Sequence, residues 1–373
     1  MRVPFAIAAF LAAQFVALPA KAAPLQGSLT ASFGPGLDTN PSKTLTSDAS
    51  VLDGFLGLSA TGRVKVGFGE GQQVSGRYDL GLRKFFLSEG EDLAVQQVAL
   101  DWAVNLGRVM LGAEASGKWW VSRAGTRDYA DLGADLFVDI ALVKALNLRL
   151  AGGARGFLYP PAYANEPVEI SDTSVDANKA YDWAGPQGSA MLRWQPARRH
   201  TLALALFGVL PYYNGFSRYE GSSEFANGRD GYPVVKRRDA QFGGQLSYSF
   251  RGPVAVQAGY SYVRINSTSY GEASERHRAF AAVSAKLPWR LYAGLLAAYQ
   301  FSSYPDGIFL SRNIELLDDD SFSSVGAKVG LAITDEVDLE LRYATYWTEL
   351  PPSSSLPTTW WRHTAFLGVT LRL

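Results

Sequence analysis

The sequence predicts an all-β fold: a transmembrane, antiparallel, up-and-down β-barrel of about 16 strands, with about 14 or 18 strands as alternatives. Three observations predict it. Apolar and polar residues alternate repeatedly over segments of about ten residues, which is the period of a strand. Short and long connections alternate along the chain. Aromatic residues gather at both ends of the segments, as they do at the two interfaces of a membrane.

The first segment, residues 1–22, is expected to be a secretory signal peptide. Met1 and Arg2 form a short basic start, residues 4–19 are almost wholly apolar, and Ala20-Lys21-Ala22 offers the small residues of a cleavage site. A single membrane anchor is the alternative interpretation. The signal peptide predicts that the mature chain leaves the cytoplasm.

The remaining residues, 23–373, are expected to form one barrel domain. Residues 128–143 show the alternation most clearly, because Leu132 and Leu136 share one parity while Asp131 and Asp135 share the other. Similar runs predict strands near residues 25–35, 51–67, 73–87, 93–105, 108–122, 128–143, 146–159, 184–196, 199–213, 238–251, 254–266, 277–288, 290–303, 323–334, 337–348 and 358–373.

The connections between these strands fall into two classes. Every even-numbered strand is followed by a short turn, such as Asn105-Leu106-Gly107 or Arg251-Gly252-Pro253. The odd-numbered strands are followed by mostly longer polar loops, the longest near 37–50, 160–183, 214–237, 304–322 and 349–357. This asymmetry is typical of membrane barrels with short periplasmic turns and long external loops.

The composition excludes several other classes. The chain has 35 Lys and Arg residues against 35 Asp and Glu residues, which argues against a nucleic-acid binder with its basic surface. The absence of Cys excludes a disulfide scaffold, thiol catalysis and Cys-ligated zinc. No segment after the signal peptide has the roughly 18 consecutive apolar residues of a membrane helix. A closed barrel is the other structure that pairs all backbone groups in lipid.

Aromatic residues support two membrane interfaces. One set lies near the long loops and consists of Phe85, Phe86, Trp119, Trp120, Tyr159, Trp183, Tyr212, Tyr213, Trp347, Trp360 and Trp361. The other lies near the short turns and consists of Trp102, Trp194, Phe250 and Trp289. A soluble β-sandwich is the alternative, but it does not explain the two aromatic levels and the loop asymmetry together.

The last segment, residues 358–373, carries an apolar parity to the end of the chain: Ala365, Leu367, Val369, Leu371 and Leu373. In this feature the chain resembles outer-membrane β-barrel proteins of Gram-negative bacteria, a porin-like class. The segment is similar to the terminal strand that the barrel-assembly machinery reads, where Phe usually stands in place of Leu373. The resemblance implies a location in the cell outer membrane, in contact with its lipid, after secretion across the inner membrane.

A weaker resemblance lies in the first strand. Gly36-Leu37-Asp38-Thr39-Asn40-Pro41 is similar to a segment that ends the first strand of barrels in export and assembly-modifier proteins with helical repeats. This resemblance implies periplasmic export partners.

A barrel of about 16 strands is wide enough for an aqueous channel, whereas about eight strands would be filled by side chains. The parity opposite to the apolar one is therefore expected to face a polar lumen. The candidate lumen-lining residues are Arg63, Lys65, Arg77, Asp79, Arg83, Glu114, Lys118, Asp131, Asp135, Asp139, Arg149, Arg155, Arg193, Lys328, Asp338, Glu340 and Arg342.

These charges are grouped by sign, with a basic sector in the second and third strands and an acidic ladder in the sixth. One interpretation is structural, because Asp139 is expected opposite Arg149, and Asp135 diagonal to Arg155, as cross-strand ion pairs. The other is functional: a pore wall that selects solutes by charge. The two interpretations are compatible.

Two long loops offer a second candidate site. Residues 160–183 carry the carboxylates Glu166, Glu169, Asp172 and Asp176, and residues 214–237 carry several aromatic side chains. Such a loop either folds inward as a constriction or stacks sugar rings on its aromatics. The alternative is an exposed surface loop.

Three functions remain open. The first is a channel that passes hydrophilic solutes or a secreted polymer such as a polysaccharide. The second is a non-conducting scaffold or assembly factor for export of surface proteins or glycans, and the third is a barrel enzyme acting on lipids. The sequence disfavours the enzyme, because the chain has only His200, His277 and His363, without a nucleophile-elbow motif or metal spacing. No catalytic residue, metal or cofactor is therefore expected.

Overall fold

The structure, a computed structural model, describes residues 25–42, 51–68, 71–124, 128–159, 181–217, 235–305, 322–349 and 359–373. The predicted signal peptide lies outside the described residues, and so do most of the two long loops considered as a second site.

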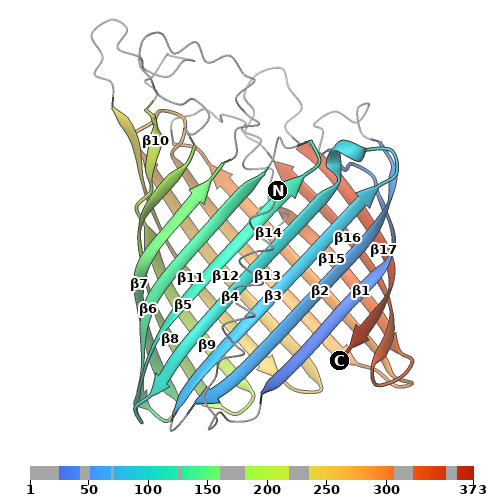
Figure 1. The fold of residues 1–373 in the computed structure, drawn as a ribbon, viewed down its shortest axis with the longest axis horizontal. Coiled ribbons are helices and arrows are strands. Elements are labelled where there is room, and N and C mark those ends of the chain that lie inside the picture. Colours follow the sequence, from blue (N-terminus) through green and yellow to red (C-terminus); the bar gives the residue numbers. More distant parts are fainter. Residues whose placement is uncertain are drawn as a thin grey trace, which may run out of the picture.

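The described residues form one antiparallel sheet that closes into a barrel (Figure 1). Its strands are β1 (Gln26–Asp38), β2 (Asp53–Phe68), β3 (Gln72–Phe85), β4 (Leu93–Asn105), β5 (Val109–Ser122), β6 (Tyr129–Val143), β7 (Leu146–Leu158), β8 (Trp183–Ala197), β9 (His200–Val209), β10 (Tyr212–Phe216), β11 (Lys236–Arg251), β12 (Val254–Ser267), β13 (Ser274–Lys286), β14 (Leu291–Ser303), β15 (Ser323–Ala332), β16 (Val337–Glu349) and β17 (Thr359–Arg372). β1 pairs with both β2 and β17, so the sheet has no free edge.

The closed barrel has 16 strands, which confirms the predicted fold class and strand number. The sheet contains 17 strand segments because β9 and β10 share one position between β8 and β11. Pro211 lies between the two segments and has no N–H to donate to a neighbouring strand. The predicted strand at 199–213 is therefore interrupted rather than continuous.

The strand register keeps apolar and charged side chains on opposite faces. Leu132 and Leu136 of β6 point outward and are exposed, as are Leu206 and Leu295 on other strands. The same alternation continues through β5 and β7, whose residues pair one to one with those of β6. Among the described residues, no helix is long and apolar enough to cross a membrane.

Short turns join the strands at one end of the barrel, the lower end in Figure 1, where β17 also finishes. In the turn between β13 and β14, Trp289 and Arg290 have φ angles of 60° and 61°. Two successive left-handed residues fit the right-handed twist of a tight hairpin. The opposite end carries the 3-10 turn η2 (Glu89–Glu91) and is called the long-loop end below.

The aromatic level predicted at the long-loop end divides between the two faces of the wall. Phe86 and Trp361 point outward and are exposed, as a membrane interface requires. Phe85, Tyr159 and Trp360 are buried instead, so the prediction that they belong to a lipid-facing belt is wrong. Residues on both faces of the wall occur at a strand end, so the level of a ring does not show which face it lies on. The alternation of side chains along the strand determines the face.

Candidate functional site

The candidate site is the inner wall of the barrel. The structure places all the predicted lumen-lining residues on one parity, opposite to the exposed apolar side chains. Arg63 on β2 pairs directly with Arg77 on β3, and Lys328 on β15 pairs with Arg342 on β16. The basic sector expected from the sequence is therefore continuous across neighbouring strands.

The inner wall also carries charged residues that the sequence reasoning missed. The cations are Arg237, Arg251, Arg276, Arg278, Lys286, Arg362 and Arg372, and the carboxylates are Asp38, Asp53, Asp101 and Asp239. With these, inward positions of the described strands hold 17 Lys and Arg residues against 11 Asp and Glu residues. Each of them lies on the inward parity of its strand, so the alternation applied to the full length of every strand would have identified them.

Cross-strand ion pairs occupy the wall from β5 to β7. Asp139 lies directly opposite Arg149, as predicted, with a closest charge separation of 3.9 Å. Arg149 makes a shorter contact of 2.5 Å with Glu114, two strands away. These contacts are possible because all three side chains project into the same space inside the curved wall.

The predicted pair between Asp135 and Arg155 is wrong. Arg155 binds both carboxylate oxygens of Asp131, at 2.8 and 2.5 Å. Asp135 accepts a hydrogen bond of 2.7 Å from Gln187 Nε2 instead. Asp131 and Asp135 are equally diagonal to Arg155 in the register, so the strand pattern alone does not choose between them.

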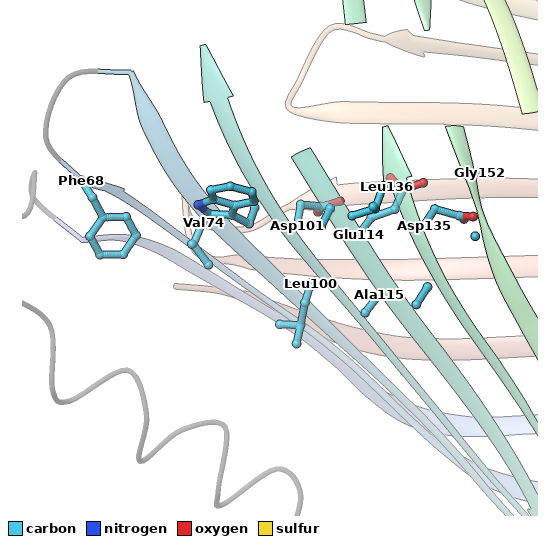
Figure 2. A pocket seen from close by; sticks show the side chains of 13 residues that line it. Phe68, Val74, Leu100, Asp101, Glu114, Ala115, Asp135, Leu136 and Gly152 are labelled. Atoms are coloured by element: carbon cyan, nitrogen blue, oxygen red, sulfur yellow. The ribbon is translucent and has the colours of Figure 1, made fainter. Parts of the chain in front are cut away.

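Three carboxylates form a row across β4, β5 and β6. Asp101 pairs directly with Glu114, which pairs directly with Asp135, and Figure 2 shows the three at one level of the wall. A cavity of about 590 Å³ lies on the other side of the wall at this level, because outward apolar side chains such as Leu100 and Leu136 contribute most of its lining. The row gives the wall one acidic sector.

The cations nevertheless reach further into the lumen than the carboxylates. Eight inward cations of the described strands are exposed, whereas no inward carboxylate there is. Arg77, for example, keeps 52% of its side chain exposed while its partner Asp79 keeps 23%. Glu114 is an exception, since it is slightly more exposed than Arg149. The described part of the inner wall therefore exposes more positive than negative charge.

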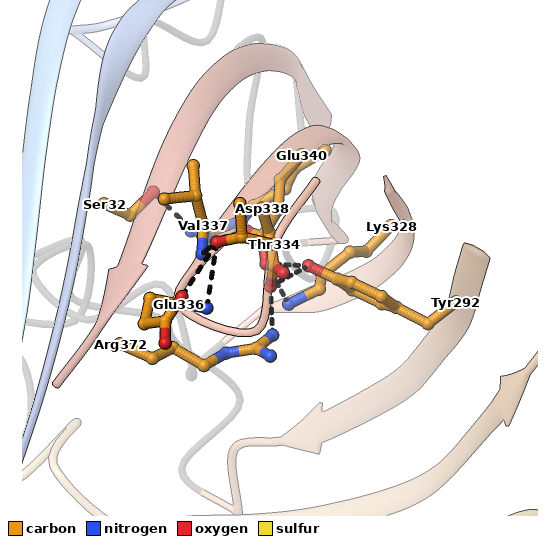
Figure 3. A network of polar contacts seen from close by, with 10 residues as sticks. Ser32, Tyr292, Lys328, Thr334, Glu336, Val337, Asp338, Glu340 and Arg372 are labelled. Carbon is orange, nitrogen blue, oxygen red and sulfur yellow. Dashed lines mark hydrogen bonds and ion pairs between the residues drawn. The ribbon is translucent and has the colours of Figure 1, made fainter. Parts of the chain in front are cut away.

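The extreme case is a network at the short-turn end (Figure 3). Asp338 and Glu340 are almost fully buried, and Lys328, Arg342 and Arg372 bind them while remaining 40–48% exposed. Tyr292 of β14 donates its hydroxyl to Glu340 at 2.6 Å. The buried acids hold the cations in place, and the cations face the lumen.

Two cavities adjoin this network. One has a volume of about 730 Å³ and includes Arg251, Lys328 and Arg342 in its lining. The other has a volume of about 790 Å³ and includes Lys286, Arg290 and Arg372. Both are large enough for small hydrated solutes. Basic side chains therefore surround the opening of the barrel at the short-turn end.

A row of aromatic rings lies on the opposite part of the inner wall, toward the long-loop end. Trp120, Tyr129, Phe157, Trp183 and Tyr213 follow one another across neighbouring strands, with ring centroids 5.3–6.3 Å apart. Three of the four successive pairs are nearly parallel, with interplanar angles of 9–20°, and the fourth is tilted at 49°. We call this row, from Trp120 to Tyr213, the aromatic arc. Charged groups lie beside it, such as Lys118, whose ammonium is 5.9 Å from the centroid of the Trp120 ring.

The rim at the long-loop end is fixed by Asp92, which follows η2. Burial acts to raise the pKa of this carboxyl, but Lys84, the Phe85 N–H and Arg123 outweigh it and hold the pKa below its usual range. Asp92 therefore stabilises the folded state fully at pH values above the pKa that it has in the unfolded chain. This stabilisation is lost as the pH falls through the lower pKa that Asp92 has in the folded protein.

The three histidines lie on outward parities, each next to a tyrosine. Their Nδ1 atoms are 2.5–2.9 Å from the hydroxyls of Tyr248, Tyr260 and Tyr343. His363 contacts Tyr343 and stacks near Trp361. Among the described residues, no group of three or more His, Cys, Asp or Glu side chains is arranged to hold a metal ion.

No family model and no curated protein matches the chain. Solved structures of outer-membrane proteins are similar to it in fold. The outer membrane channel DcaP of Acinetobacter baumannii is 12% identical with a TM-score of 0.51, covering 95% of this chain and 99% of its own. An anion-selective porin from Comamonas acidovorans is 8% identical with a TM-score of 0.48, covering 94% and 100%. A loop-deletion mutant of OmpT, an outer membrane protein of Vibrio cholerae, is 7% identical with a TM-score of 0.44, covering 95% and 100%. At these identities the likeness shows the fold, that of an outer-membrane β-barrel.

Proposed function

We propose that this chain is an outer-membrane channel that passes hydrophilic solutes and favours anions. The observation that carries the proposal is the inner wall, where exposed Lys and Arg side chains stand over buried or half-buried carboxylates. A barrel of 16 strands is wide enough for an aqueous path. The chain reaches the outer membrane through the signal peptide expected at residues 1–22.

The charge balance supports an anion preference. Inward positions of the described strands carry 17 cations against 11 carboxylates, so their net charge is positive although the whole chain is balanced. Low-dielectric walls focus such a field into the water between them and raise the local concentration of counter-ions. Anions therefore enter the lumen more readily than cations of the same size.

The test is the reversal potential of single channels in planar bilayers under a salt gradient. The wild-type protein is expected to favour the anion. Replacing three exposed cations together, Arg63→Gln, Lys65→Gln and Arg77→Gln, should lower this preference, whereas Asp135→Asn should raise it. Lys84→Gln is the matched control, because Lys84 shares β3 with Arg77 but lies on the outward parity.

Two results would overturn the proposal. A cation-selective wild type would contradict the anion preference. If the triple variant and Asp135→Asn leave both conductance and selectivity unchanged, these residues do not line a conducting pore. A complete lack of stable conductance steps would favour the scaffold alternative, in which the barrel assists export without an open path.

A carbohydrate polymer is the second candidate cargo, and the arc from Trp120 to Tyr213 favours it. Phe157 of this arc is directly opposite Asp131, so aromatic rings and the Arg155–Asp131 pair offer apolar contact and hydrogen bonds along one stretch of wall. The same recordings distinguish the cargoes. A neutral oligosaccharide that binds this arc interrupts the current in discrete events, whereas a channel for small anions alone passes current without such blocks.

A further inference from the structure

A row of directly paired residues crosses the inner wall near the short-turn end. Its members, in order from β11 to β15, are Arg251, Ala255, Ser284, Gly294 and Lys328. The two cations at its ends are four strand spacings, or about 19 Å, apart along the wall. The three residues between them are small, and the cavity of about 730 Å³ lies over them. Most of its lining residues have the inward parity, and we call this cavity the basic pocket.

Tyr292 and Lys286 bound the basic pocket on the side of the short turns. Lys286 pairs directly with Tyr292, and the adjoining cavity that Lys286 lines shares Ser284 and Tyr292 with the pocket. The Tyr292 ring lies against Gly330 of β15, since a Cβ added to Gly330 would collide with it. Figure 3 shows Tyr292 reaching toward the buried acids, and the Lys328 ammonium is 5.1 Å from its ring centroid. These contacts hold Tyr292 in place beside the pocket.

Two of the surrounding cations are not neutralised by a carboxylate. Lys328 binds Glu340 at 2.7 Å. By contrast, no carboxylate of the described residues forms an ion pair with Arg251 or Lys286, and both of these residues are exposed. Only β12 separates their strands, so they stand about 10 Å apart across the sheet, with the small side chain of Ala255 on the intervening strand. Two like charges in this arrangement favour an anion between them.

The pocket also presents neutral polar side chains. Gln257 of β12 pairs with Ser249 of β11, and both line the cavity together with Ser284. Gln257 and Ser284 are exposed on the inward parity. An amide and a hydroxyl can each donate and accept hydrogen bonds, as the hydroxyl groups of a solute require. The pocket therefore combines groups that bind an anion with groups that bind hydroxyls.

We propose that the basic pocket binds a phosphorylated sugar. The phosphate group lies between Arg251 and Lys286, and the sugar hydroxyls contact Gln257 and Ser284. A phosphate ester offers three acceptor oxygens, and a guanidinium binds them with paired hydrogen bonds. The volume of about 730 Å³ lies in the range of small-molecule sites and leaves room for the sugar. The inference rests on the proposed channel, which brings the solute to the pocket, and it names the class of anion.

The test is isothermal titration calorimetry of the full-length protein in detergent at a fixed, low ionic strength. The probes are glucose 6-phosphate, glucose and inorganic phosphate. The wild type is expected to bind glucose 6-phosphate at least about tenfold more tightly than glucose, because hydrogen bonds to charged groups are the stronger ones. It should also bind glucose 6-phosphate more tightly than inorganic phosphate, which lacks the sugar hydroxyls.

Variants separate the two halves of the pocket. The double variant Arg251→Gln, Lys286→Gln should bind glucose 6-phosphate at least about tenfold more weakly than the wild type. It removes no ion pair among the described residues, so it should fold. Gln257→Ala should weaken the binding of glucose 6-phosphate but not that of inorganic phosphate. Arg193→Gln is the matched control, because it removes an exposed inward cation from β8, outside the pocket, and should leave the affinity nearly unchanged.

Three results would overturn the inference. In the first, the wild type binds glucose 6-phosphate no more tightly than glucose. In the second, it binds inorganic phosphate as tightly as the sugar phosphate, which leaves a simple anion site. In the third, the double variant binds as tightly as Arg193→Gln. Calorimetry requires no current, so any of these results beside an anion-selective conductance contradicts the pocket alone, and intact binding without conductance contradicts the channel alone.

Discussion

At the scale of single residues, the most constrained charge pair closes the barrel. Arg362 of β17 donates from Nε to both carboxylate oxygens of Asp38 on β1, at 3.0 and 2.9 Å, and from Nη2 at 2.6 Å. Both side chains are almost fully buried. Asn40 extends the contact, because its side chain donates to the Trp361 carbonyl. The pair therefore joins strands that are 324 residues apart in sequence.

Arg362→Leu should consequently lower the free energy of unfolding by about 3–5 kcal/mol, because it leaves the Asp38 carboxylate buried without a counter-ion. Urea titration in detergent, followed by tryptophan fluorescence, measures this change. Arg77→Gln is the control, since its ion pair with Asp79 is exposed and should contribute about 1 kcal/mol or less. Equal losses in the two variants would show that Asp38 is satisfied in another way.

At the scale of elements, the junction between β1 and β17, which we call the seam, depends on a glycine. A Cβ added to Gly34 of β1 would lie 2.0 Å from the Leu367 carbonyl oxygen and 2.6 Å from the Gly368 Cα. Both atoms belong to the backbone of β17, so relief requires that the strands move apart. Gly62 on β2 is a matched position with nothing within 4 Å of an added Cβ.

Gly34→Ala should therefore weaken the pairing of β1 with β17, at a cost of about 1–3 kcal/mol as in other overpacked sites. The readout is the temperature at which the folded barrel converts to its slower-migrating unfolded form on a denaturing gel. The Ala substitution at Gly34 should lower this temperature, and Gly62→Ala should leave it nearly unchanged. A stable Gly34→Ala barrel would mean that the seam tolerates a wider separation.

The element scale also shows what the sequence could predict. Parity assigned Arg63, Asp135 and Lys328 to one face because a strand alternates its side chains strictly. Parity did not predict how deep each charge lies. Glu340 is 2% exposed and Lys328 is 42% exposed although both share the inner face, because their positions depend on side-chain length and on Tyr292 from a third strand. Partner choice, as for Asp135 and Gln187, likewise depends on contacts between strands that are not adjacent in sequence.

At the scale of the whole molecule, the distribution of charge matters more than its total. The chain is balanced overall, yet in the described strands the inner wall is basic and the outer face carries few charges. A closed sheet makes this separation possible, because each strand contributes alternate residues to two surfaces that never mix. Selectivity should then arise from the field of many exposed side chains rather than from one binding site.

A field of this kind has a measurable consequence for salt dependence. The screening length is about 10 Å at 0.1 M ionic strength and about 3 Å at 1 M. Exposed cations such as Arg77 and Arg372 should therefore act across the lumen at low salt and only close to the wall at high salt. The anion preference, measured as reversal potential at a fixed concentration ratio, should be largest at low salt and fall steeply toward 1 M. A preference that persists unchanged at 1 M would place selectivity at a narrow contact site, where ions meet the protein without intervening water.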